Sequence, residues 1–93
     1  MKLNTIAGKN DVFRSSFIGG QVVLTQGVAA LEQNVQSQVV EAVQKFKTFE
    51  PGNDPYGEHD FGKVVVAGVD YFWKIDIYPE EKRVLTIMLA SEY

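Results

Sequence analysis

The chain has 93 residues, of which 45% are hydrophobic and 12% aromatic, and it contains no cysteine. That length suffices for one small domain, and the lack of cysteine excludes a disulfide framework or a thiolate zinc site. Nine basic and twelve acidic residues give a net charge of -3, which disfavours sequence-independent binding to nucleic acid through phosphate contacts. We expect a single domain over residues 1–93 with no direct nucleic-acid partner.

The sequence also carries no sign of export or of membrane insertion. Residues 1–5 lack the apolar stretch of a signal peptide, and no run approaches the roughly 18 apolar residues that a membrane span requires. We therefore expect a cytoplasmic protein with no membrane partner.

A helix and a strand are predicted first. Apolar residues recur at near-helical spacing at the start of the chain, at Leu3, Ile6, Phe13 and Phe17. After Gly19-Gly20, the short β-branched run 21–25 predicts a strand that Gly27 ends.

A second helix is predicted by one apolar stripe with polar residues on the other faces: Val35, Val39, Val43 and Phe46. Asn34 is its expected N-cap, and Pro51-Gly52 prevents its continuation beyond about Phe49.

From Phe61 the apolar period changes to 2, which predicts strands over 61–66, 69–78 and 83–90. Ala67-Gly68 and the turn 78–81 are short enough to join them as an antiparallel meander. In the middle strand Tyr71, Trp73, Ile75 and Ile77 should share the core face. We predict an α+β fold: an antiparallel sheet of about four strands with two helices packed on one face, in the order α-β-α-β-β-β.

Residues 53–62, Asn-Asp-Pro-Tyr-Gly-Glu-His-Asp-Phe-Gly, form the densest polar cluster and contain the single histidine. Carboxylates and an imidazole suit a metal or general acid-base site, here Asp54, Glu58, His59 and Asp60. Asp54, Pro55 and Gly57 also match a type I turn in which the aspartate caps backbone amides. If residues 58–60 were extended, His59 would point away from its two acidic neighbours.

A second polar pair, Lys74 and Asp76, lies on the wetter face of the middle strand. These i, i+2 neighbours can pair with each other as a surface ion pair. Alternatively, Lys74 could face Asp60 or Glu58 on the adjacent strand and form a polar patch around His59.

Charge is unevenly distributed along the chain. Residues 1–49 hold three acidic and five basic residues, whereas residues 50–93 hold nine acidic and four basic ones. If these carboxylates gather on one exposed face, they would attract a basic partner surface; otherwise they form an ordinary solvated surface. Phosphate-binding loops, dinucleotide fingerprints, nucleophile elbows and HExxH helices are absent from the sequence.

Three segments together resemble a bacterial family known as domain-of-unknown-function family 3768: NDPYGEHDFG, FWKIDIY and the final RVLTIMLASEY. The segments DVFR, GGQVVLTQGV and KFKTF extend the similarity through the first half. The family usually carries a longer polar insertion before the last strand, where this chain has only residues 79–82. The resemblance implies no established activity, cofactor or substrate; its members resemble accessory genes of plasmids, phages and other mobile elements.

The leading hypothesis is a small acidic, non-enzymatic interaction module that binds a basic host protein complex, in its specific form an anti-CRISPR or anti-restriction inhibitor. The candidate binding residues are Asp54, Glu58, His59, Asp60, Lys74, Asp76, Glu80 and Glu81. The alternative is a small metal-dependent hydrolase or ligand-binding protein with its site at residues 53–62. A third hypothesis is a homo-oligomer that pairs through an exposed sheet edge. We expect no cofactor.

Overall fold

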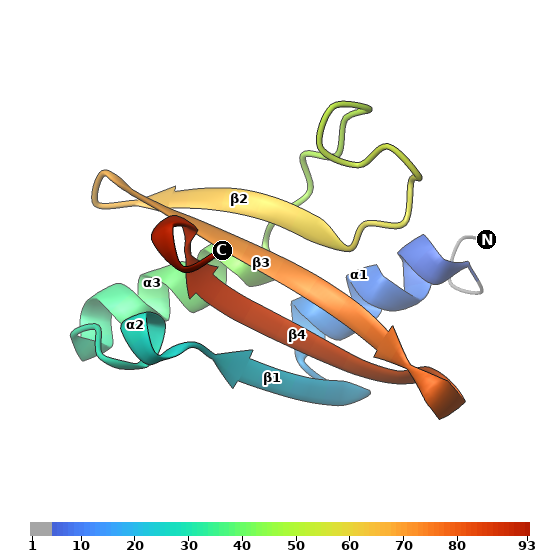
Figure 1. Cartoon of the computed structure of the whole chain (residues 1–93), viewed down its shortest axis with the longest axis horizontal. Helices are drawn as coiled ribbons and strands as arrows, with labels where there is room; N and C mark the ends of the chain where they lie inside the picture. The colour runs from blue at the N-terminus through green and yellow to red at the C-terminus, as the bar shows by residue number, and fades with distance from the viewer. Residues whose placement is uncertain (1–4) are drawn as a thin grey trace.

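The computed structural model describes residues 5–93, which form a four-stranded sheet with a layer of helices against it (Figure 1). The helices are α1 (Ile6–Ser16), α2 (Gln26–Ala29) and α3 (Gln33–Gln44), together with the short 3-10 helices η1 (Pro79–Glu81) and η2 (Ala90–Glu92). The strands are β1 (Gly20–Leu24), β2 (Phe61–Val66), β3 (Val69–Tyr78) and β4 (Lys82–Leu89). The predicted α+β class is confirmed.

The last three strands lie where the alternation of apolar and polar residues predicted them. The bounds of β2 and β3 agree with the predicted ranges, and β4 begins one residue early. Ala67 and Gly68 form the predicted two-residue hairpin, with φ angles of 53° and 76°. Positive φ at both positions is typical of a type I′ turn, whose twist matches that of the flanking strands.

The sheet is mixed, not wholly antiparallel as predicted. Its order is β1-β4-β3-β2, and β1 runs parallel to β4, from Gly20 opposite Arg83 to Leu24 opposite Ile87. An alternation of apolar and polar residues identifies a strand but does not indicate whether it runs parallel or antiparallel to its neighbour. Here the long connection through the helices, β2 and β3 returns the chain beside β1 in the same direction.

The second predicted helix, α3, is shorter than its apolar stripe suggested. Glu32, not Asn34, is its N-cap, and it ends at Gln44 instead of near Phe49. The chain leaves the helix because Phe46 and Phe49 turn toward Trp73, with ring centroids 5.4 and 6.2 Å from it. The single-turn helix α2 was not predicted, although its Val28 is fully buried.

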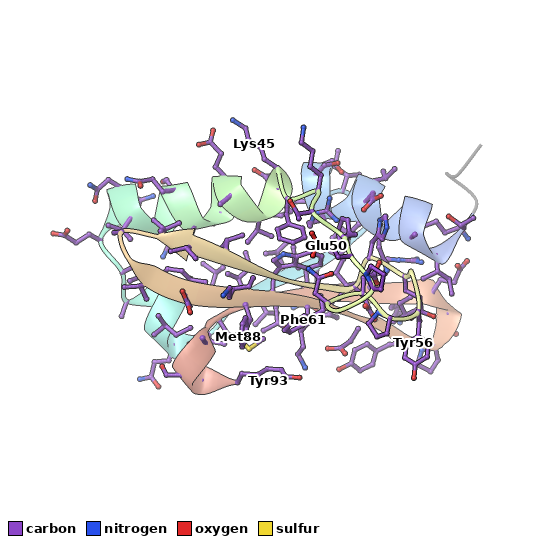
Figure 2. The ribbon with its side chains drawn as sticks, turned by 90° about the horizontal axis from the view of Figure 1, so that it is seen from above. Lys45, Glu50, Tyr56, Phe61, Met88 and Tyr93 are labelled. Atoms are coloured by element: carbon purple, nitrogen blue, oxygen red, sulfur yellow. The ribbon has the colours of Figure 1, made fainter. Side chains whose placement is uncertain are left out.

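The first helix begins at Ile6, where the Thr5 hydroxyl accepts a hydrogen bond from the Gly8 amide at 2.9 Å. Leu3 of its predicted stripe lies outside the described residues. Figure 2 shows α1 and α3 on one side of the sheet, with Met88 and Tyr93 on the other, as predicted for helices on one face. None of the helices within residues 5–93 has the length and apolar character that a membrane crossing requires.

The core lies between the helices and the sheet. Trp73 is fully buried at its centre, and Tyr71 and Ile75 beside it on β3 are also buried, whereas Ile77, predicted on the same face, is 44% exposed. The rest of the core comes from the three α-helices and from the strands on either side of β3: Phe13, Val28, Val39, Val43, Val64, Val66, Leu85 and Ile87.

The C-terminal 3-10 helix η2 is hydrogen-bonded to the residues that follow β1. The Glu92 carboxylate accepts hydrogen bonds from the Thr25 hydroxyl at 2.6 Å, the Leu89 amide at 2.8 Å and the Gly27 amide at 2.9 Å. These bonds, led by the one from Thr25, lower the pKa of Glu92 below its usual 4.5. The ionised carboxylate therefore connects η2 to the β1–α2 junction.

Close packing at Gly62 predicts a steric cost for any side chain there. A Cβ at this position would lie 2.5 Å from Trp73 Nε1 and 2.8 Å from a Phe46 ring carbon. Gly62→Ala should lower the free energy of unfolding by about 1–3 kcal/mol in urea titrations. The control Gly52→Ala meets no atom within 4 Å and should not destabilise the protein. Equal unfolding midpoints for both variants would contradict this packing.

The Glu92 contacts predict a pH effect of defined sign. Because the pKa of Glu92 is lower in the folded state, its contribution to the free energy of unfolding is complete above the pKa of the unfolded state. That contribution is lost as the pH falls through the pKa of the folded state. Glu92→Gln should therefore lower Tm at neutral pH, and the difference from wild type should shrink toward about pH 3. Glu32→Gln, at a side chain without a capping bond, is the control. A difference that is constant with pH would refute the assignment.

Candidate functional site

The polar segment 53–62 begins with the predicted turn, which is confirmed. The Gly57 amide donates to the Asp54 carbonyl at 3.1 Å, and Asp54 Oδ1 accepts from the amides of Glu58 and His59, both at 3.1 Å. The Asp54 side chain is only 5% exposed. Its carboxylate therefore serves the loop itself and is not presented to a partner.

His59 lies between two carboxylates. Its Nδ1 is 2.9 and 3.0 Å from the two carboxylate oxygens of Asp11 in α1, and its Nε2 is 3.6 Å from Asp54 Oδ2. The imidazole stacks on Phe49 with centroids 3.8 Å apart and planes 4° from parallel. The backbone has a positive φ of 54°, so residues 58–60 do not enter the strand extended. Both ring nitrogens thus have acidic neighbours from different parts of the chain.

Arg14 connects this histidine to the core. Its guanidinium donates to Asp11 Oδ1 at 2.9 Å, to the Val43 carbonyl at 3.1 Å and to the Phe46 carbonyl at 2.7 Å. The same group lies 5.3 Å from the Phe49 ring centroid and 5.1 Å from that of Trp73. Since its side chain is 5% exposed, these contacts replace the water that a charged group needs.

Asn10 makes the corresponding link to the sheet. Its side chain is fully buried, donates to the Glu58 carbonyl at 2.9 Å and accepts from Arg83 Nε on β4 at 2.8 Å. We call these six side chains the buried polar cluster, although those of Asp11 and His59 remain 40% and 27% exposed: Asn10, Asp11, Arg14, Asp54, His59 and Arg83. It joins α1, α3, β4 and the loop before β2.

The sequence pattern indicated Asp54 and His59 as candidate site residues but did not indicate the other four members. Asp11 and Arg14 were quoted only as part of the DVFR segment, although their i, i+3 spacing is that of a helical ion pair. Nothing local marks Asn10 and Arg83, which are 73 residues apart in sequence and meet only in the fold.

The side chains of the buried polar cluster contact one another and the backbone, as groups that stabilise a fold do. Within residues 5–93, no group of three or more histidine or acidic side chains is arranged to hold a metal ion. The Asp–His–Asp arrangement instead directs its polar atoms at each other and at backbone amides, which fixes the loop conformation.

Lys74 does not join His59. The Lys74 ammonium pairs with Asp76 at 3.3 Å, so the simpler of the two interpretations is correct. Lys74 follows Trp73 on β3, so the two side chains project from opposite faces of the sheet. His59 stacks on Phe49, which packs against Trp73, so His59 and Lys74 lie on different faces. The predicted polar patch around His59 is not formed.

The remaining candidate residues come together at one end of the molecule. The end of β3, η1, the start of β2, the preceding loop and the first turns of α1 all lie at the same end of the sheet (Figure 1). There, the Ile75 amide donates to the Asp60 carbonyl at 2.8 Å, and Lys9 of α1 pairs with Glu81 at 3.0 Å. We call the carboxylates at this end the acidic end: Glu58, Asp60, Asp76, Glu80 and Glu81.

Cations balance part of this charge. Lys82 lies 3.7 Å from Glu80, and a hydrogen bond from Lys9 lowers the pKa of Glu81, which keeps it ionised. Among the described residues, no cation lies within ion-pair distance of Glu58 or Asp60. Five carboxylates thus stand against four cations, the ammonium groups of Lys9, Lys74 and Lys82 and the buried guanidinium of Arg83 at 4.0 Å from Glu81, which leaves an excess of negative charge.

Two exposed tyrosines flank the acidic end. Tyr56 is 87% exposed and, with Glu58 and the start of α1, lines a shallow groove of about 390 Å³. Tyr78 is 54% exposed and lines a second groove, of about 600 Å³, with Glu81. Figure 2 shows Tyr56 projecting from this end, away from the sheet. Each groove therefore combines an aromatic ring with a carboxylate.

Comparison with known proteins identifies the family but no activity. Residues 24–83 match the model of the family described as protein of unknown function (DUF3768). Because this match covers more than half of the chain, the chain belongs to that family, as the sequence motifs suggested. Of the quoted segments, DVFR, the first half of GGQVVLTQGV and all of RVLTIMLASEY after Arg83 lie outside the matched residues. Neither the curated proteins nor the solved structures contain a significant match.

The contacts of Arg14 predict a large effect of its removal. Arg14→Met retains much of the side-chain volume but leaves the carbonyls of Val43 and Phe46 without their donor and Asp11 without its cation. The free energy of unfolding should fall by about 2–4 kcal/mol in urea titrations.

The matched control is Lys45→Met, which also removes one positive charge. Lys45 is 74% exposed and, among residues 5–93, forms an ion pair with Glu41 alone, on the surface of α3, so a change within about 0.5 kcal/mol is expected. If both variants unfolded at the same urea concentration, Arg14 would not have the role assigned to it.

Proposed function

We propose that this member of the DUF3768 family is a small protein-interaction module that binds a basic partner surface through its acidic end. The observation that carries the proposal is the placement of five partly exposed carboxylates, from the loop before β2, from β3 and from η1, at the same end of the sheet (Figure 1). Residues 22 positions apart in sequence, such as Glu58 and Glu80, thus contribute negative charge to one end of the molecule. Such a concentration of one charge raises the rate of encounter with an oppositely charged surface.

The buried polar cluster supports this role by fixing the loop in advance. Glu58 is held through both backbone groups, because its amide donates to Asp54 and its carbonyl accepts from Asn10. A loop that is already ordered loses little conformational entropy on binding, which leaves more of the contact energy for affinity.

The two tyrosines provide the apolar part of the proposed interface. Tyrosine is enriched among the residues that dominate binding energy, because its ring buries a large area and its hydroxyl can still hydrogen-bond. Tyr56 and Tyr78 are both more than half exposed beside carboxylates, so a basic partner could cover the rings and pair with the charges.

In its specific form, the proposed partner is a host complex that handles nucleic acid or defends against foreign DNA. Such complexes present basic surfaces to phosphates, and a small acidic protein can occupy those surfaces in place of the nucleic acid. An anti-CRISPR or anti-restriction inhibitor would fit the chain length, the net charge of -3 and the resemblance to mobile-element genes.

The test compares charge reversals at the two ends of the molecule. Glu58→Lys with Glu80→Lys changes the acidic end, whereas Glu32→Lys with Asp70→Lys makes the same change in net charge at exposed positions at the opposite end (Figure 1). Proteins retained from a bacterial lysate by each immobilised variant are quantified at low and high salt. The acidic-end variant should lose at least about tenfold of a salt-sensitive partner that the control retains.

Equal retention by the two variants, or retention that high salt leaves unchanged, would contradict the acidic end as the binding surface. The inhibitor form has a separate readout, the plating efficiency of phage on cells with active restriction or CRISPR immunity. Expression of the wild-type protein should raise plating, and the acidic-end variant should not. If the acidic-end variant loses the partner but the wild-type protein never changes plating, the result supports the interaction module and contradicts the anti-defence role.

A further inference from the structure

The far edge of the sheet is formed by β1, of which only the first residues, Gly20 and Gln21, border the acidic end, in the groove of Tyr78 and Glu81. It pairs with β4 on one side and, among the described residues, with no strand on the other. Three of its five residues are exposed, and Ile18 just before it is 76% exposed. An open edge leaves alternate backbone N–H and C=O groups without a strand partner.

This edge lacks the features that usually prevent strand pairing. No charged residue and no proline occurs between Ser15 and Leu31, in a chain in which 23% of residues are charged. The opposite edge strand, β2, carries an exposed lysine, Lys63, at its centre. Lysine and proline at an edge are common protections against pairing with another chain, and β1 has neither.

We infer that β1 is a self-association surface and that its partner is β1 of a second copy of this chain. An antiparallel arrangement about a two-fold axis at Val22 would place Gly20 of one copy opposite Leu24 of the other. Both copies then use the same residues, as a closed symmetric dimer requires. The result is one continuous sheet of eight strands.

Charge argues for a second copy as the occupant. Each chain carries a net charge of -3, so two copies repel each other most where their carboxylates meet. The segment 15–31 contributes no charge of its own to such a contact, and carboxylates border it only at its ends, Glu81 beside Gly20 and Glu92 on Thr25. On the open face, Val23 of one copy would lie opposite Gln21 of the other, so the paired strand residues carry no like charges.

The short strand sets the strength of the association. β1 has five residues, so the edge contact alone buries less area than a standard stable interface. The dimer should therefore be weak and depend on protein concentration, with its dissociation constant in the micromolar range or above. This expectation separates edge pairing from an obligate dimer, which would show no monomer on dilution.

The test places a lysine on each edge in turn. Val23, 36% exposed on β1, and Val65, 59% exposed on β2, both project from the sheet face opposite the helices. Sedimentation-equilibrium mass is measured from micromolar to submillimolar protein. The wild type and Val65→Lys should approach twice the chain mass of 10.4 kDa, whereas Val23→Lys should weaken the association by at least about tenfold.

A wild-type protein that stays monomeric over this range would overturn the inference, as would Val65→Lys dissociating the dimer while Val23→Lys leaves it intact. Circular dichroism checks that each variant is folded. If Val23→Lys does not fold, Gln21→Lys on the same strand replaces it, because this exposed polar residue contributes nothing to the core. Undiminished association of a folded edge-lysine variant would equally contradict pairing through β1.

Discussion

The fold depends on one buried positive charge, the guanidinium of Arg14. Burying a charge without partners would cost several kcal/mol, and here three hydrogen bonds and two aromatic faces replace the lost water. Two of those bonds end on the carbonyls of Val43 and Phe46, where the chain leaves α3. The same side chain therefore sets the position of α1, the end of α3 and, through Asp11, the place of His59.

This dependence changes the meaning of the most distinctive segment of the sequence. Residues 53–62 have the composition of a reactive site, yet Asp54 caps its own loop and His59 is held between two carboxylates. Their chemistry is used to hold a loop in one conformation. The exposed part of the segment, Tyr56 with Glu58, is what that conformation presents to a partner.

The sequence was sufficient for those features that depend on local pattern. Alternation from Phe61 onward, with small turn residues at Ala67-Gly68, placed β2 and β3 to the residue, and Asp54 was recognised as a turn cap. It was insufficient where distant residues decide. The direction of β1 depends on a partner strand more than 60 residues later, and the end of α3 depends on contacts with both Arg14 and Trp73. Asn10 lacks any local signal, because its partners, Arg83 and the Glu58 carbonyl, are distant in sequence.

The central claim is that the loop before β2 is a rigid part of the fold because of the buried polar cluster. Hydrogen exchange at the amides of Glu58 and His59, both bonded to Asp54, tests it most directly. The account predicts protection of these two amides close to that of the amides of β3, since the loop should open only when the domain unfolds. Exchange at the rate of an unstructured peptide would contradict it, because His59 would then leave its carboxylates while the sheet stayed folded.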